Sequence, residues 1–257
     1  MNVQSRDQAV LEGAVSVQAA LESGSREIQA IYIQREKQNR PIVRLERSAK
    51  SQGLDVKRVD VDEIEALTSG KTHGGVVALV GPRRFLTLDA LIQDRERPFV
   101  VMLDGIEDPF NFGAAVRALY AAGVDGLVVR PRNWMSAAGI VARSSAGATE
   151  QMPTAVAETA ADAASFFRRR GLTVACATKE RAVSIYQADL TLSLFLAIGG
   201  EKRGITRSFL RQADLRLSIP YGRRFQRSLG TASAVAVLAF EAMRQRQDTV
   251  PSTRFGS

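Results

Sequence analysis

The chain has 257 residues, of which 45% are hydrophobic and 24% charged, and its formal net charge is +8. These values are typical of a soluble globular protein of one or two domains. They exclude a membrane-spanning protein, because no apolar run approaches the roughly 20 residues that a span requires. The N-terminus also lacks the apolar segment of a signal peptide.

The rarest residue types restrict the chemistry further. Cys176 is the only cysteine, so no intrachain disulfide can form, and its place in the apolar run 172–177 predicts a buried thiol in a reducing cytoplasm. His73 is the only histidine, which argues against a Ser-His-Asp triad or a histidine-rich metal site. For His73 itself, a turn or packing role is favoured over a binding role.

In the first 92 residues, helical and extended patterns alternate, which predicts a small α/β domain over residues 1–92. Predicted helices cover residues 13–23, 41–53 and 61–67, and predicted strands cover 27–33, 56–59 and 75–80. A Gly-Pro break at 81–82 and a predicted connecting helix at 88–95 lead into the second half.

Residues 97–247 show the same alternation with longer apolar runs, which predicts an α/β domain with a mostly parallel sheet covered by helices on both faces. The predicted strands are 99–103, 127–130, 172–177, 194–198 and 215–219, and the predicted helices are 113–122, 136–141, 158–170, 206–212 and 231–247. The polar tail 248–257 is expected to be disordered.

The loop after the first of these strands carries a distinctive group of polar residues. Residues 104–117 read DGIEDPFNFGAAVR, so that Asn111 and Arg117 follow the carboxyl end of a strand, where open α/β sheets bind ligands. Taken alone, the same residues could also be helix caps and turns with a solvated arginine.

Two further strand ends carry comparable loops. Residues 199–204 read GGEKRG, in which the glycines let bare backbone approach a ligand closely. Residues 219–230 read IPYGRRFQRSLG, a basic loop that ends at Ser228 before a helix of small residues. The surplus of arginine around both loops favours a polyanionic partner.

In this order, the three segments resemble the signatures of the SpoU/TrmH family of RNA 2'-O-ribose methyltransferases, which belongs to the SPOUT superfamily. The signatures are D-x-x-x-DP-x-N-x-GA-x-x-R, G-x-E-x-x-G and IP-x-x-x-x-x-x-SLN, and residues 145–148 also match the family's SAGA element. This chain departs from the third signature, since its loop is about one residue longer and Gly230 replaces the usual Asn. Residues 1–92 resemble the small RNA-binding domain that precedes the catalytic domain in many members.

The resemblance implies a trefoil knot, formed by the chain around residues 198–204 and 219–229, and S-adenosylmethionine as the cofactor. The implied cofactor contacts are Gly199, Ile219 and Leu229, with Thr178, Gly200 and Gly204 beside them. The implied catalytic residues are Asn111, Arg117, Glu201 and Ser228, and the implied RNA contacts are Arg223, Arg224 and Arg227. The resemblance also implies a cytoplasmic homodimer that acts on rRNA or tRNA without a metal ion or a membrane.

Each implied catalytic residue has a physically reasonable role. Arg117 is expected to clamp a phosphate and to lower the pKa of the ribose 2'-hydroxyl rather than to act as a base, because a guanidinium hardly ever loses its proton. Asn111 would orient Arg117 or the ribose, and Glu201 would pair with Arg117 or anchor its own loop. Ser228 would donate a hydrogen bond to the substrate or cap the last helix.

Two alternatives remain open at this point. The chain could be a catalytically impaired, RNA-binding member of the family, for which Gly230 is the main argument. It could also methylate a tRNA base, as related knotted enzymes do, but the DP-x-N and SL signatures argue against that reading.

Overall fold

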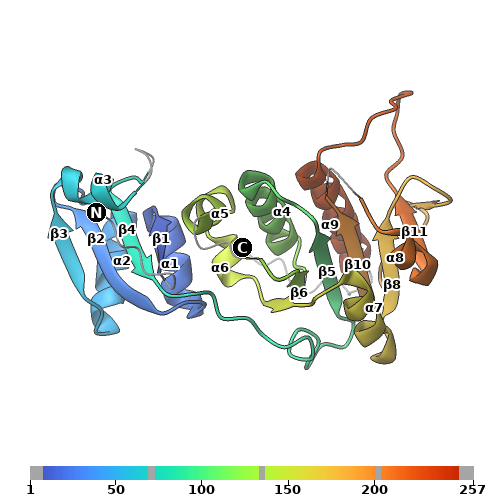
Figure 1. The fold of residues 1–257 in the computed structure, drawn as a ribbon, viewed down its shortest axis with the longest axis horizontal. Coiled ribbons are helices and arrows are strands. Elements are labelled where there is room, and N and C mark those ends of the chain that lie inside the picture. Colours follow the sequence, from blue (N-terminus) through green and yellow to red (C-terminus); the bar gives the residue numbers. More distant parts are fainter. Residues whose placement is uncertain (1–7, 69–72, 133–136, 201–203, 249–257) are drawn as a thin grey trace. The chain divides into compact units, whose positions relative to one another are not determined.

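The computed structural model describes residues 8–68, 73–132, 137–200 and 204–248 (Figure 1). By its internal contacts the chain divides into two compact units. The first unit comprises Met1–Phe85, Asp108–Arg117 and Arg132–Met152, and the second comprises the remaining segments. Helix α4 (Pro109–Ala121) begins in the first unit and ends in the second.

The first unit contains a four-stranded sheet with the order β1-β4-β2-β3. Its strands are β1 (Ala9–Glu12), β2 (Ile28–Gln34), β3 (Val56–Val59) and β4 (Val76–Val80), and its helices are α1 (Ala14–Ser23), α2 (Arg40–Ser51), α3 (Val61–Leu67), α5 (Ala138–Ser144) and α6 (Ala148–Gln151). Helix α2 starts where the side chain of Asn39 accepts a hydrogen bond from the Ile42 amide, with Pro41 in the first turn. Ala138 and Ala142 of α5 join the apolar core of this sheet.

The second unit contains a seven-stranded sheet with the order β7-β6-β5-β10-β8-β11-β9, in which every pairing is parallel. Its strands are β5 (Phe99–Asp104), β6 (Gly126–Val129), β7 (Thr154–Val156), β8 (Thr173–Ala177), β9 (Val183–Ser184), β10 (Leu194–Gly199) and β11 (Leu215–Ser218). The predicted α/β class with a parallel sheet is therefore confirmed, whereas the predicted knot stays a prediction.

Helices cover both faces of this sheet (Figure 1). Phe167 of α7 (Ala160–Arg169) and Phe209 of α8 (Arg207–Gln212) pack with Val100 and Phe195 on one face. On the other face, the guanidinium of Arg246 in α9 (Thr231–Asp248) lies 4.9 Å from the centre of the Phe99 ring. Because successive strand residues point to opposite faces, Phe99 and Val100 serve different layers.

The two rare residue types are buried, as predicted. Cys176 has no exposed surface, and burial raises the pKa of its thiol to about 11, so it is an inert core residue. His73 is 5% exposed, and its Nδ1 accepts a hydrogen bond from the Gly75 amide in the turn before β4. The predicted turn role of His73 is confirmed.

Several predicted boundaries were wrong. Residues 88–94 form successive turns rather than a helix, and the left-handed backbone of Asp94 (φ 57°) ends the last of them. Helix α4 begins at Pro109 rather than at residue 113, since the Asp108 carboxylate accepts a hydrogen bond from the Asn111 amide at 2.7 Å and caps the helix. Strands β1, β7 and β9 and helix α6 were missed. Each has only two to four residues, and the three strands lie at the edges of their sheets.

Three predictions fall on residues that the structure does not describe. The disordered tail was predicted for residues 248–257, of which only Asp248 is described, at the end of α9. The catalytic candidate Glu201 and the first residue of the helix predicted at 136–141 also lie outside the described residues. The described part of that helix, α5, continues to Ser144.

A buried ion-pair network holds α6 in the first unit. Glu150 Oε2 lies 3.0 Å from Arg26 Nε and 3.7 Å from Arg83 Nη1, and it accepts a hydrogen bond from Ser25 Oγ at 2.7 Å. The Glu150 and Arg26 side chains are only 1% and 6% exposed. Burial by itself raises the pKa of Glu150, but Arg26 and Arg83 outweigh it and hold the pKa below its ordinary value of 4.5.

We expect Glu150→Gln to lower the free energy of unfolding by about 3–5 kcal/mol at neutral pH, because it leaves two buried guanidinium groups without a carboxylate. A folded-state pKa below 4.5 means that the Glu150 contribution is complete well above that pH and is lost as the pH falls through the folded-state value. The free energies of unfolding of wild type and Glu150→Gln, measured with urea, should therefore become equal in acid. Asp55→Asn, which removes an exposed pair with Lys57, is the control and should change stability by less than about 1 kcal/mol. If the free energies of unfolding of wild type and Glu150→Gln differed by the same amount at every pH, this explanation would be wrong.

Candidate active site

A cavity of about 620 Å³ opens at the carboxyl ends of β8, β10 and β11 in the second unit. This is the edge of a parallel sheet at which ligands bind, because the strands end there in loops free to vary. Every residue predicted to contact the cofactor lines this cavity, namely Thr178, Gly199, Gly200, Gly204, Ile219 and Leu229. Ser228, predicted as catalytic, lines it too. The structure thus brings together residues that lie up to 51 positions apart in the sequence, from 178 to 229.

Backbone contacts at two glycines join the first and second signatures. Strand pairing sets Gly199 beside Asp104, and the Gly200 amide donates a hydrogen bond to the Asp104 carbonyl at 2.7 Å. A Cβ on Gly200 would lie 2.0 Å from the Gly105 carbonyl oxygen, and a Cβ on Gly199 would lie 2.3 Å from the Gly204 carbonyl carbon. Only glycine fits at these positions, so this rim of the cavity consists of bare backbone.

The other walls of the cavity are largely apolar, with polar groups at the strand ends. Apolar side chains come from strands β10 and β11, helices α8 and α9 and the flanking loops, namely Ile198, Ile205, Leu210, Leu217, Ile219 and Leu238. Thr178, Lys179 and Glu180 follow β8 and supply hydrogen-bonding and charged groups. Apolar walls, bare backbone and a few polar groups suit the adenine, ribose and amino-acid parts of S-adenosylmethionine, so these residues fit that cofactor.

The loop of the third signature is tied to the end of β8. Lys179 Nζ donates a hydrogen bond to the Arg227 carbonyl at 2.8 Å and lies 5.3 Å from the centre of the Tyr221 ring. The Tyr221 hydroxyl in turn accepts a hydrogen bond from the Leu229 amide at 3.1 Å. Sequence reasoning missed both Lys179 and Tyr221. Their one signal was their position, because each lies two residues after the end of a predicted strand.

The predicted RNA contacts Arg223, Arg224 and Arg227 are exposed on this loop. Phe225 lies among them and is 55% exposed, with its ring 6.0 Å from the Tyr221 ring. Exposed aromatic rings among arginines are the combination with which proteins hold single-stranded nucleic acid.

The two predicted roles of Ser228 can now be separated. Helix α9 begins at Thr231, so the residue before it is Gly230 and Ser228 is not the N-cap. The capping alternative was therefore wrong. A Cβ at Gly230 would meet nothing within 4 Å, so packing does not enforce this departure from the family pattern.

Asn111 and Arg117 lie on α4 within the first unit, and both are exposed. Asn111 is in the first turn of the helix, next to the Asp108 cap. Arg117 forms no ion pair with any residue that the structure describes, which leaves its guanidinium available to a ligand. Asn111 and Arg117 therefore belong to the first unit, whereas Ser228 belongs to the second.

Asp104 was not among the predicted site residues, although it opens the first signature. It is 7% exposed at the carboxyl end of β5, beside Gly199. Its Oδ1 has no hydrogen-bond partner among the described residues, and the nearest cation, Arg130 Nη1, is 3.6 Å away. A buried carboxylate oxygen without a donor is costly, so this atom is a candidate ligand contact.

Comparison with known proteins gives the family. The SpoU rRNA Methylase family matches residues 98–240, which is more than half of the chain. The chain belongs to the SpoU rRNA methylase family. A second family, described as RNA 2'-O ribose methyltransferase substrate binding, matches residues 10–86. The family and the methyltransferase class predicted from the sequence are confirmed.

Curated relatives cover nearly the whole chain. The 23S rRNA (guanosine-2'-O-)-methyltransferase RlmB of Shewanella oneidensis is 29% identical over 94% of this chain and 99% of its own length. RlmB of Escherichia coli K12 is 29% identical over 92% of this chain and 98% of its own length.

Two solved structures share the fold. The AdoMet-bound rRNA methyltransferase from Sinorhizobium meliloti has a TM-score of 0.78 at 24% identity, covering 95% of this chain and 89% of that one. The SpoU methyltransferase AviRb from Streptomyces viridochromogenes, in complex with AdoMet, has a TM-score of 0.77 at 22% identity, covering 96% and 94%.

In the part of the chain that is described, no helix is both long and apolar enough to cross a membrane. Within the same residues, no group of His, Cys, Asp and Glu side chains could hold a metal ion.

Proposed function

We propose that this chain methylates the ribose 2'-hydroxyl of a guanosine in 23S rRNA. The observation that carries the proposal is the cavity at the sheet edge, which gathers the second and third signatures around one space. The RlmB relatives, which align over more than nine-tenths of the chain, support the choice of 23S rRNA over tRNA. Action on ribosomal RNA also supports a cytoplasmic location.

The residues around the cavity divide the work between binding and alignment. S-adenosylmethionine, when bound, supplies an electrophilic methyl group on its sulfonium. Gly199, Ile219 and Leu229 hold it through backbone and apolar contacts, with Thr178, Gly200 and Gly204 beside them. Ser228 donates a hydrogen bond to the RNA, and Arg223, Arg224 and Arg227 hold its phosphates. The protein's main task is then to align the 2'-hydroxyl with the methyl group.

Arg117 clamps an RNA phosphate and stabilises the oxyanion that develops as the 2'-hydroxyl loses its proton. The proton goes to a phosphate oxygen or to water, since the guanidinium cannot accept it. Asn111 orients Arg117 or the ribose, and Glu201 pairs with Arg117 or anchors its loop. The domain boundaries that accompany this proposal are 1–92 for RNA binding and 97–247 for methyl transfer.

Transfer of a radiolabelled methyl group tests the proposal. Purified protein should label 23S rRNA that lacks the modification and should leave 16S rRNA and tRNA unlabelled. Mapping should place the label on a guanosine ribose. Labelling of tRNA alone, or of a base, would overturn the choice of substrate.

The cofactor should bind without RNA, because all its proposed contacts belong to the protein. Calorimetry with S-adenosylhomocysteine should show one site per chain. Two variants form a matched pair. Glu180→Gln changes a carboxylate that lines the cavity, and Glu36→Gln changes an exposed carboxylate of the first unit. Only Glu180→Gln should change the affinity for S-adenosylhomocysteine. If millimolar S-adenosylhomocysteine produced no heat of binding, the assignment of this cavity as the cofactor site would be wrong.

We also infer that the protein is a homodimer. The apolar positions Val235, Leu238, Ala239 and Ala242 of α9 are buried within the chain, so they do not supply a dimer interface. Phe240 is an exposed large apolar side chain on the same helix, with 42% of its surface exposed, and is therefore available for an interface. Light scattering should give twice the 27.9 kDa chain mass, and Phe240→Glu should reduce it. A monomer mass for the wild type at micromolar concentration would refute this inference.

A further inference from the structure

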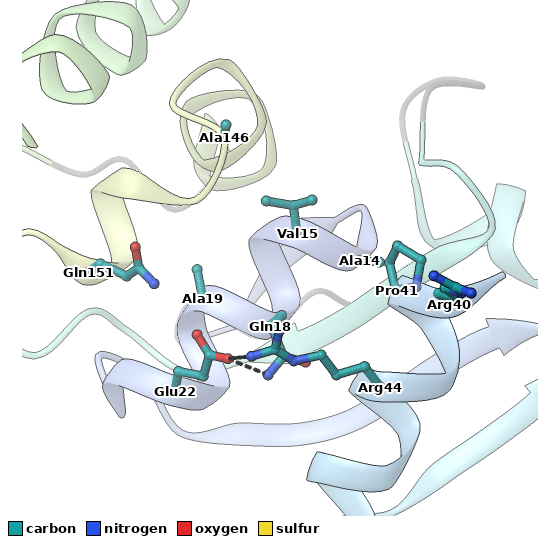
Figure 2. A pocket seen from close by; sticks show the side chains of 10 residues that line it. All are labelled: Ala14, Val15, Gln18, Ala19, Glu22, Arg40, Pro41, Arg44, Ala146 and Gln151. Atoms are coloured by element: carbon teal, nitrogen blue, oxygen red, sulfur yellow. Dashed lines mark hydrogen bonds and ion pairs between the residues drawn. The ribbon is translucent and has the colours of Figure 1, made fainter. Parts of the chain in front are cut away.

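A second cavity, of about 470 Å³, lies within the first unit between α1, the start of α2 and the segment around α6 (Figure 2). One face of α1 forms its floor, with the small apolar side chains Ala14, Val15 and Ala19. Arg40, Pro41 and Arg44 of α2 form one wall, and Ala146 and Gln151 form the opposite wall (Figure 2). The volume is sufficient for one nucleotide.

The polar groups of this cavity leave one acceptor unused. Gln18 Nε2 and Arg44 Nη2 both donate to Glu22 Oε1, at 2.8 and 3.1 Å (Figure 2). Gln18 Oε1 is buried and has no hydrogen-bond partner among the described residues. An unsatisfied buried acceptor costs free energy that a ligand N–H group would recover.

The wall opposite α2 is held in place by buried contacts. The Glu150 network described above fixes α6 beside the sheet, and Gln151 follows it directly. At the SAGA element, Gly147 has a left-handed backbone (φ 83°), and a Cβ there would lie 2.7 Å from the Ala19 Cβ. This close approach packs the SAGA turn directly against α1, which forms the floor of the cavity.

We propose that this cavity binds one unstacked nucleotide of the RNA substrate. The base would lie on the methyl groups of Ala14, Val15 and Ala19, and a base N–H would donate to Gln18 Oε1. Arg40 and Arg44 would hold the adjacent phosphate, since a guanidinium has five N–H donors and Arg44 uses one of them on Glu22. RNA readers hold splayed bases by stacking them on aromatic or arginine side chains and by hydrogen bonds to the base edges. In this cavity the methyl groups would supply the apolar contact, and Arg40 and Arg44 the cationic groups. The inference rests on the proposed function, because it takes RNA as the ligand.

The test measures binding of a short fluorescein-labelled single-stranded RNA to the full chain by fluorescence anisotropy. Gln18→Leu and Arg44→Gln should each weaken binding about tenfold, which is the size of one lost base contact. Arg47→Gln is the matched control, because it removes one exposed charge from the same helix without lining the cavity. It should change affinity about twofold or less, as expected for one general electrostatic contact.

A blocking pair makes the test independent of charge. Val15 is 58% exposed and lines the cavity, whereas Val43 is 42% exposed on α2 and does not. Val15→Trp should weaken RNA binding, and Val43→Trp should not. Thermal unfolding separates binding from folding: Gln18→Leu should leave the melting temperature unchanged or higher, because it removes an unsatisfied buried acceptor.

The outcomes distinguish this inference from the proposed function. Equal RNA affinity for wild type, Gln18→Leu, Arg44→Gln and Val15→Trp would overturn the nucleotide site, even if wild type methylates rRNA. If the three variants lose RNA affinity but the wild type methylates no RNA, the site stands and the proposed activity fails.

Discussion

Replacing Arg117 by alanine is expected to lower the rate of methyl transfer at least about a hundredfold, the usual loss when one preorganised donor to a developing oxyanion is removed. Arg117→Lys should restore little of the rate, because a single ammonium cannot reproduce a bidentate guanidinium contact. The affinity for S-adenosylhomocysteine should stay unchanged, since Arg117 acts on the RNA. Single-turnover transfer of a radiolabelled methyl group to 23S rRNA is the measurement.

The control for this variant is Arg169→Ala, which removes another exposed arginine, on α7. Both variants should keep the wild-type stability within about 0.5 kcal/mol, as exposed substitutions usually do. Full methyl-transfer activity of Arg117→Ala would show that Arg117 does not clamp an RNA phosphate during the reaction. Loss of cofactor binding with an intact fold would mean that Arg117 serves the cofactor rather than the RNA.

Replacing Gly200 by alanine is expected to weaken cofactor binding at least about tenfold and to lower the free energy of unfolding by about 1–3 kcal/mol. The new Cβ would lie 2.0 Å from the Gly105 carbonyl oxygen, so the strand ends of β5 and β10 must separate. Their separation also breaks the hydrogen bond from the Gly200 amide to the Asp104 carbonyl. Calorimetry with S-adenosylhomocysteine and urea unfolding measure the two effects.

Gly230→Ala is the matched control, because a Cβ at this exposed glycine would contact nothing within 4 Å. It should bind the cofactor as the wild type does. If Gly200→Ala also binds normally, the bare backbone at the end of β10 is not part of the cofactor site.

Local patterns by themselves determined five strands of the second sheet, namely β5, β6, β8, β10 and β11, and the identity of the signatures. The apolar runs that became β5, β8, β10 and β11 are long enough for their pattern to be read without knowledge of the partner strands. The glycines at 199, 200 and 204 could be assigned to a ligand site because no other residue allows backbone to approach so closely. Arg117 and Asn111 likewise stood out through their place after a strand end.

Only the tertiary structure decided which distant residues meet. Lys179 and Tyr221 lie 42 positions apart, from 179 to 221, and no local pattern predicts that an ammonium and a phenol ring will tie two loops together. The short strands β1, β7 and β9 exist because a neighbouring strand supplies their hydrogen bonds, which makes them invisible to periodicity. The same holds for Glu150, an ordinary acidic residue in the sequence that became a buried ion-pair partner because Arg26 and Arg83 were brought to it. Burial and charge pairing depend on contacts made across the chain, and such contacts are a property of the folded structure alone.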